Sequence, residues 1–340
     1  MRWDQPYELR KTQLEYDIFL VSNGGMGFTP GIEKVGALGG TELECNLLLE
    51  ELAKLGLKVG SMNNIGSAVK SKGVECWPIS DLKILDIKTK ILINMRGINP
   101  PGGIAFQRVV SWLTDNVNPA QQYFMDTVPP QLGQRTVAVS DFHLSQCKTQ
   151  WNPIRIHNMV PQFIYDHPRV KKDFNLFVYA SAAMKGLPET LKAWNELRNH
   201  YTIKKSKLLV LSPGYDMPDM EELKKTKNVE FMGPQKIQDL AGILARAGGL
   251  FQVNTMPETF GLIYAFAEAV GCTPHALCLN SFGALKEVVN TPVVTNDLKV
   301  FQQNITDYSG GKNKCLNPKD FSVETIFKEW VAVLERVTSG

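Results

Sequence analysis

The chain has 340 residues, of which 44% are hydrophobic and 21% are charged. This composition is typical of a globular protein and excludes a wholly disordered or low-complexity chain. One hydrophobic core rarely grows beyond about 250–300 residues, so we expect two domains. The 37 basic and 34 acidic side chains give a formal charge of +3, which neither indicates nor excludes a nucleic-acid partner.

The six cysteines are scattered and form no CxxC pair. This pattern favours buried, reduced thiols over a zinc site or a disulfide framework. The N-terminal segment has no apolar signal core, and no apolar run approaches the length of a membrane span. We therefore expect a cytoplasmic protein without stable membrane insertion.

Strands and helices alternate along the first half of the chain. An apolar run at 17–22 predicts a buried strand, and the Gly-rich segment after it is far longer than a usual βα connection of about 2–6 residues. The leucine spacing over 41–56 then predicts a helix with Thr41 as its N-cap. Further elements are predicted as strands at 57–63, 73–79, 90–95, 108–113 and 136–140, and as a helix at 141–151.

A second series begins after a Pro-broken, charge-rich linker at 154–173. Its strands are predicted at 174–181, 207–214, 228–233, 249–255, 275–280 and 292–296. Its helices are predicted at 188–200, 220–226, 236–247, 261–271, 284–290 and 320–337. The α/β alternation predicts two Rossmann-like, doubly wound domains that face each other across a cleft.

Ligands of such sheets bind at the carboxyl ends of the strands, where helix N-termini favour phosphates. Gly39 and Gly40 stand directly before the first helix, where free N–H groups could hold an anion. The simpler interpretation is an ordinary turn, and the spacing is not the GxGxxG of a dinucleotide site. Ser181 and Lys185 lie in the loop after the first strand of the second series, where an ammonium could neutralise a diphosphate. A solvated surface lysine is the alternative.

A third segment, PETFGLIYAFAEAVG at 257–271, places a carboxylate in a loop before a helix. Glu258 could accept hydrogen bonds from sugar hydroxyls. The backbone amides of Phe260, Gly261 and Leu262 could hold phosphate. Glu268 lies ten residues after Glu258, and its simpler interpretation is a charge on the helix surface.

This third segment resembles the signature of retaining glycosyltransferases with the two-domain GT-B architecture, most closely glycosyltransferase family four. The Gly39–Gly40 pair, Lys185–Gly186, NVEFMGPQ at 228–235 (with Gly233) and AVSDFHLSQ at 138–146 fall where that family has its motifs. The resemblance covers roughly residues 17–340. It implies an N-terminal acceptor-side domain at 1–158, a donor-side domain at 159–320, and a C-terminal helix at 321–340 that packs back on the first domain.

The resemblance also implies roles for single residues. Glu258 would contact the transferred sugar, and Thr259 with the amides after it would hold the sugar and diphosphate. Lys185 would be one member of the family's basic pair, but Ala180 stands where the family has the Arg. The family's second Glu binds the ribose. Phe266 stands at that position, so either Glu268 takes the ribose or ribose recognition differs.

The resemblance implies transfer of a sugar from a nucleotide-diphosphate donor, with UDP favoured over GDP, and with retention at the anomeric carbon. It implies no metal cofactor, and the sequence contains no DxD motif. Asp115 and Asn116 fall near the expected acceptor. That acceptor stays open among a glycan, a small molecule and a modified base in DNA. Two other hypotheses are an NAD-dependent oxidoreductase and an inactive, sugar-nucleotide-binding relic of the same fold.

Overall fold

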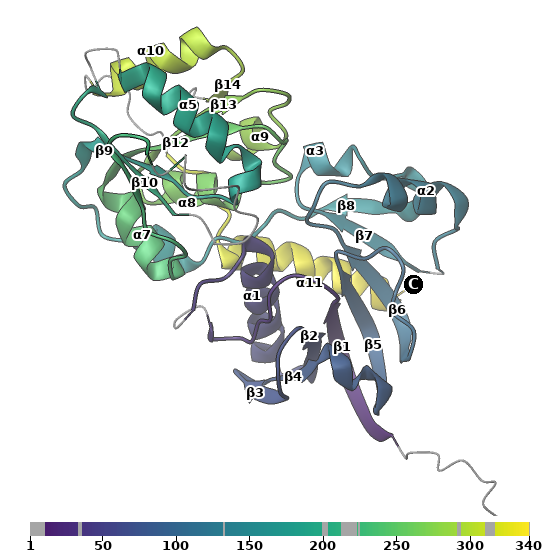
Figure 1. Cartoon of the computed structure of the whole chain (residues 1–340). Helices are drawn as coiled ribbons and strands as arrows, with labels where there is room; N and C mark the ends of the chain where they lie inside the picture. Colours follow the sequence, from purple (N-terminus) through teal and green to yellow (C-terminus); the bar gives the residue numbers. More distant parts are fainter. Residues whose placement is uncertain are drawn as a thin grey trace, which may run out of the picture.

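The computed structural model describes residues 11–32, 36–131, 133–198, 203–211, 223, 225–290, 294–309 and 317–339. Two α/β lobes lie side by side, each built on its own sheet (Figure 1). None of the helices in these ranges is long and apolar enough to cross a lipid bilayer.

The N-terminal domain contains an eight-stranded sheet in the order β3-β4-β2-β1-β5-β6-β7-β8. Its strands are β1 (Thr12–Ser22), β2 (Val59–Asn63), β3 (Val69–Ser71), β4 (Val74–Pro78), β5 (Leu85–Met95), β6 (Ile104–Trp112), β7 (Arg135–Ala138) and β8 (Pro153–Arg155). Every pairing is parallel except that of β3 with β4. The apolar run of β1 is buried at its carboxyl half, as expected for a strand covered on both faces of a parallel sheet.

The same part of the chain also forms the helices α1 (Gly40–Lys54), α2 (Pro119–Thr127) and α3 (Asp141–Leu144). The predicted N-cap is wrong by two residues, because Gly39 caps α1 and Thr41 lies within it. Helix α2 begins with a capping box between Asn118 and Gln121 that the sequence analysis did not use. The helix predicted over 141–151 forms only α3 and a separate 3-10 turn at Thr149–Trp151.

The C-terminal domain contains a six-stranded, wholly parallel sheet in the order β11-β10-β9-β12-β13-β14. Its strands are β9 (Asp173–Tyr179), β10 (Lys207–Val210), β11 (Val229–Phe231), β12 (Ala247–Asn254), β13 (Thr273–Cys278) and β14 (Val294–Thr295). Its helices are α4 (Gln162–Tyr165), α5 (Leu187–Arg198), α7 (Ile237–Arg246), α8 (Leu262–Ala269), α9 (Leu285–Val288) and α10 (Leu298–Ser309). The central strand β12 is buried along its whole length.

The predicted alternation of strands and helices is confirmed in both domains, with five elements of the described residues missed. These are β3, β8, α2, α4 and α10, of which β3, β8 and α4 have only three or four residues each. The predicted linker at 154–173 contains most of β8 and all of α4. The helix predicted at 220–226 lies mostly outside the described residues.

The last helix, α11 (Val323–Ser339), leaves the C-terminal domain and packs along the N-terminal domain, where it contacts α1 and β5 (Figure 1). The Trp330 ring lies edge-on against Trp112 at a centroid distance of 4.7 Å, and both rings are buried. The Arg108 Nε donates a hydrogen bond to the Val337 carbonyl. The chain therefore crosses between the domains twice, once near 156–172 and once near 317–322.

We expect Trp330→Ala to lower the free energy of unfolding by about 3–5 kcal/mol, because it empties a fully buried site in the first domain. Tyr123→Ala on α2 is the matched control: this side chain is 71% exposed, so its removal should change stability by no more than about 0.5 kcal/mol. Urea unfolding measures both values. Equal, small effects would contradict the role of α11 as a core element.

Candidate functional site

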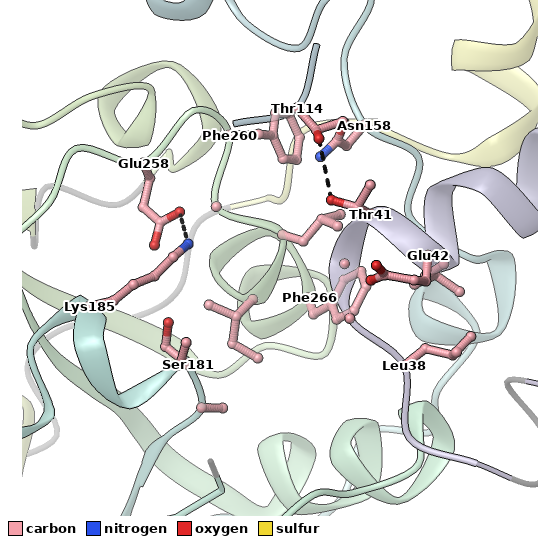
Figure 2. A pocket seen from close by; sticks show the side chains of 18 of the residues that line it. Leu38, Thr41, Glu42, Thr114, Asn158, Ser181, Lys185, Glu258, Phe260 and Phe266 are labelled. Atoms are coloured by element: carbon pink, nitrogen blue, oxygen red, sulfur yellow. Dashed lines mark hydrogen bonds and ion pairs between the residues drawn. The ribbon is translucent and has the colours of Figure 1, made fainter. Parts of the chain in front are cut away.

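A cavity of about 420 Å³ lies between the two domains and draws its walls from both (Figure 2). Its lining comprises residues 37–43, 96, 114–115, 158, 180–182, 184–185, 211, 234–235, 237, 240, 258–263 and 266. These segments follow carboxyl ends of strands or begin helices, as the doubly wound topology requires.

Two helix N-termini meet at this cavity. Helix α1 begins at Gly40, helix α8 begins at Leu262, and both residues belong to the lining. A Cβ on residue 40 would lie 2.9 Å from the Leu262 Cδ1 atom, so the two helix starts lie close together and a larger residue at 40 would require the Leu262 side chain to move. The first N–H groups of a helix lack partners within it and carry partial positive charge. The positive ends of two helix dipoles therefore lie at the cavity.

The N-cap of α8 is Gly261, which has φ 88° and ψ 60°. A side chain would be strained in this left-handed conformation, and a Cβ there would lie 2.8 Å from the Leu285 Cδ2 atom. This turn brings the backbone of Phe260 and Gly261 to the cavity wall. The local sequence thus places the start of α8 at the cavity wall, in the segment where the sequence analysis expected a helix to begin.

Lys185 and Glu258 form an ion pair of 2.9 Å on the C-terminal side of the cavity (Figure 2). The side chain of Lys185 is 40% exposed, whereas that of Glu258 is 7% exposed. The backbone of each residue is held by its own domain: the Thr255 N–H donates to the Lys185 carbonyl, and the Ala284 N–H donates to the Glu258 carbonyl. The pair is therefore a fixed carboxylate beside a cation that faces the cavity.

Two buried tyrosines lie close to this pair. Burial, reinforced by the charge of Glu258, raises the pKa of both Tyr179 and Tyr264 above the usual value for a phenol. The Tyr264 hydroxyl accepts a hydrogen bond from Asn254, and the Tyr179 hydroxyl donates to the Ala182 carbonyl. Both phenols remain neutral and help to shape the wall behind Glu258.

Arg96 is a site residue that the sequence analysis missed. It follows β5 directly, has φ 60°, and contacts Glu42 at 3.2 Å and Asp115 at 3.0 Å. Its N–H donates to the Trp112 carbonyl, so the next strand holds its backbone. A positive φ in a non-glycine residue is costly and is found mainly where the surrounding structure imposes it. The only signal in the sequence was its place at the carboxyl end of a strand.

The N-terminal wall of the cavity is polar and hydroxyl-rich. The Thr41 hydroxyl donates to the Thr114 hydroxyl at 3.4 Å, and Asn158 lies beside them (Figure 2). The Asn158 Oδ1 atom is buried and has no hydrogen-bond partner within the described part of the chain. Behind this wall Glu44 accepts the Met159 N–H, and burial raises the pKa of Glu44 well above its usual range.

Most of the predicted site residues meet at this cavity. Those that line it are Gly39, Gly40, Asp115, Ser181, Lys185, Glu258, Thr259, Phe260, Gly261 and Leu262. Three predicted residues do not line it, namely Asn116, Gly233 and Glu268.

Glu268 and Phe266 lie as a regular helix requires. Positions 266 and 268 differ by about 200° around an α-helix, so they face nearly opposite ways. Phe266 lines the cavity, whereas the Glu268 carboxylate is buried and accepts the Asn290 N–H at 3.0 and 3.1 Å. The structure therefore places Glu268 away from the cavity, in a contact that holds the segment after α9.

The loop of Glu258 is also held by the opposite domain. The Asn116 Nδ2 donates to the Pro257 carbonyl at 2.9 Å, and the Thr259 hydroxyl donates to the Thr114 carbonyl at 2.6 Å. The Ser140 hydroxyl donates to the Thr259 carbonyl and accepts the His143 N–H of α3. Asn116, which was expected to bind an acceptor, is engaged in this domain contact.

No group of three or more His, Cys, Asp or Glu side chains within the described ranges is arranged to hold a metal ion. The charged groups of the cavity wall instead come from Glu42, Arg96, Asp115, Lys185 and Glu258.

The chain resembles solved glycosyltransferase structures over nearly its whole length. AviGT4, involved in avilamycin A biosynthesis, matches with a TM-score of 0.66 and 16% identity over 96% of this chain and 98% of that one. HepE from Anabaena, solved with UDP and glucose, matches with a TM-score of 0.64 and 12% identity over 94% and 100%. WaaG, involved in lipopolysaccharide biosynthesis, matches with a TM-score of 0.60 and 11% identity over 95% of each chain.

At these identities the likeness concerns the fold, which is GT-B, as the sequence resemblance predicted. No protein-family model matches the sequence, and no curated protein matches it.

We expect stability to depend on pH through His143, which supports the contact between α3 and the Glu258 loop. Burial lowers the pKa of His143 from 6.5 to about 4, against an opposing effect of Asp115. Between pH 6.5 and about pH 4, His143 is protonated in the unfolded chain but not in the folded chain. The free energy of unfolding therefore falls as the pH falls through this range. The loss should reach up to about 3 kcal/mol at pH 4.

The variant His143→Gln isolates this contribution. Its free energy of unfolding should fall less than that of the unmodified chain between pH 6.5 and 4, as measured by urea unfolding at each pH. Parallel pH profiles would show that His143 titrates normally in the folded state.

Proposed function

We propose that the protein is a glycosyltransferase that moves a sugar from a nucleotide-diphosphate sugar to a hydroxyl acceptor, with retention at the anomeric carbon. The observation that carries this proposal is the joint placement of Lys185, Glu258 and two helix N-termini around one interdomain cavity. A UDP-sugar is the favoured donor, in agreement with the UDP present in the structure of HepE.

The diphosphate is proposed to bind beside Lys185 and the N-termini of α1 and α8. A lysine ammonium has three donors, so Lys185 can keep its bond to Glu258 while it binds a phosphate oxygen. The N–H groups of Gly261 and Leu262 add donors without a side chain. These positive groups would stabilise the charge that grows on the leaving diphosphate as the glycosidic bond breaks.

The sugar and the nucleoside are proposed to occupy neighbouring parts of the cavity. Glu258 is buried, fixed and able to accept two sugar hydroxyls. The lining also includes the apolar side chains of Leu211, Ile237, Leu240 and Phe266, which suit the flat face of a base. Because Glu268 is engaged with Asn290, we propose that the ribose is held by other groups, such as Gln235, which also lines the cavity.

The acceptor is proposed to approach from the N-terminal wall. Thr41, Thr114, Asp115 and Asn158 offer hydroxyl, carboxylate and amide groups there, all suited to a hydroxylated molecule. Transfer with retention forms the bond from the acceptor oxygen to the anomeric carbon on the face from which the diphosphate departs. The acceptor proton passes to the departing phosphate oxygen, so no protein nucleophile is needed.

Lys185→Ala tests the donor site directly. We expect UDP affinity to fall about 10- to 100-fold, because one charge-assisted contact to phosphate is lost. Isothermal titration calorimetry measures it, with Lys192→Ala as the control, since Lys192 is an exposed lysine on α5 outside the cavity lining. Unchanged UDP affinity in Lys185→Ala would refute the assignment, and stabilisation by NAD instead of UDP would favour an oxidoreductase.

Donor turnover should persist without divalent cations. Lys185 and the helix N-termini supply the positive charge that a metal provides in other enzymes of this chemistry. In the presence of EDTA, UDP should be released from a UDP-sugar at close to the rate measured in Mg²⁺. Mass spectrometry measures both rates. Complete loss of turnover in EDTA, restored by Mg²⁺ or Mn²⁺, would show that a metal is required.

A further inference from the structure

The segment that carries Glu258 belongs to the donor-side domain but is fastened on both sides of Glu258 to the other domain. Before it, the Pro257 carbonyl accepts the Asn116 amide at 2.9 Å. After it, the Thr259 hydroxyl donates to the Thr114 carbonyl at 2.6 Å. Glu258 therefore sits between two interdomain hydrogen bonds, one residue away from each.

The orientation of the Asn116 amide is fixed by its second partner. Its Oδ1 atom accepts from the Gln146 Nε2 at 2.9 Å, and the Gln146 Oε1 accepts the Val117 N–H at 2.9 Å. This arrangement leaves the Asn116 Nδ2 directed at the Pro257 carbonyl. An aspartate could not make both contacts, because it has no donor when ionised.

The Thr259 contact reaches the acceptor wall. Thr114 accepts Thr259 through its carbonyl, and its hydroxyl faces Thr41 in the cavity. The Thr259 hydroxyl is therefore used by the domain contact, although the sequence resemblance had implied that it binds the donor. The residue after Glu258, Thr259, is therefore hydrogen-bonded to Thr114, which is itself part of the acceptor wall.

We propose that Asn116 and Thr259 are positioning residues for Glu258: they hold its carboxylate against the donor sugar only while the two domains are together. This inference rests on the proposed function. Displacement of a catalytic group by about 1 Å can lower the reaction rate up to a hundredfold. Loss of either of the two hydrogen bonds beside Glu258, its tethers, can therefore lower turnover substantially. UDP is proposed to bind through Lys185 and the helix N-termini. Neither tether contacts these groups directly, and the Lys185 backbone, although its side chain pairs with Glu258, is held separately by the Thr255 N–H.

The proposal separates sugar recognition from nucleotide recognition. Loss of either tether lowers turnover of a UDP-sugar and leaves the affinity for UDP unchanged. A merely structural role, in contrast, would weaken both together, because the same loop leads into the N-terminus of α8.

The test compares Thr259→Val, which removes the hydroxyl at nearly constant shape, with Thr259→Ser, which retains it. The probes are UDP for calorimetry and, for hydrolysis without acceptor, whichever of UDP-glucose, UDP-galactose and UDP-N-acetylglucosamine the unmodified protein cleaves fastest. We expect Thr259→Val and Asn116→Ala each to lower kcat about tenfold, with UDP affinity changed less than about twofold. Thr259→Ser should recover most of the lost rate.

Two further variants calibrate the result. Glu258→Gln gives the largest effect that loss of the carboxylate can have, and the tether variants should not exceed it. Thr338→Val removes a hydroxyl on α11, far in sequence from the loop and outside the cavity lining, and should leave both measurements unchanged.

The outcomes are distinct. A normal kcat in Thr259→Val, no recovery in Thr259→Ser, or a parallel fall of UDP affinity would overturn the positioning role and leave the proposed function intact. If the unmodified protein neither binds UDP nor hydrolyses any of the three UDP-sugars, the proposed function is refuted and the positioning role with it.

Discussion

The approach of two helix N-termini across the interdomain cavity is the constraint around which the rest of the site is arranged. Like partial charges repel, so the facing starts of α1 and α8 need negative charge nearby. The protein supplies part of it with Glu42 in the first turn of α1 and Glu258 in the loop before α8. Both carboxylates are themselves paired with cations, Arg96 and Lys185. An anionic ligand between the helices would complete this balance.

The same charges divide the cavity into two unequal halves. On one side Arg96 stands between Glu42 and Asp115, a cluster with one more negative than positive group. On the other side Lys185 stands beside one carboxylate, Glu258, and the start of α8 belongs to the same domain. Under the proposed function, this asymmetry favours the charged leaving group on the C-terminal side and an uncharged hydroxyl compound on the N-terminal side.

Local patterns in the sequence were enough to predict the parallel sheets, the Lys185 loop and the start of α8. Helix periodicity alone also separated Phe266 from Glu268, since their angular difference does not depend on the tertiary structure. Arg96 could not be found in this way, because its role depends on Glu42 and Asp115, which lie 54 and 19 positions away in the chain. Asn116 and Thr259 were identified as interesting positions, but their partners are backbone carbonyls of the other domain, and no residue pattern encodes such a contact. The helix expected over 141–151 ended early for a related reason: its residues pack into tertiary contacts that local propensity does not contain.

The position of α11 has a consequence for how the chain acquires its structure during synthesis. The first sheet ends at Arg155, but the helix that covers one of its faces begins at Val323. At an elongation rate of about 5–20 residues per second, roughly 8–34 s separate the emergence of these two segments from the ribosome. Throughout that interval the apolar surface around Trp112 remains uncovered, and the second domain has time to fold first. The packing of the first domain can therefore be completed only after α11 has emerged, long after the rest of that domain.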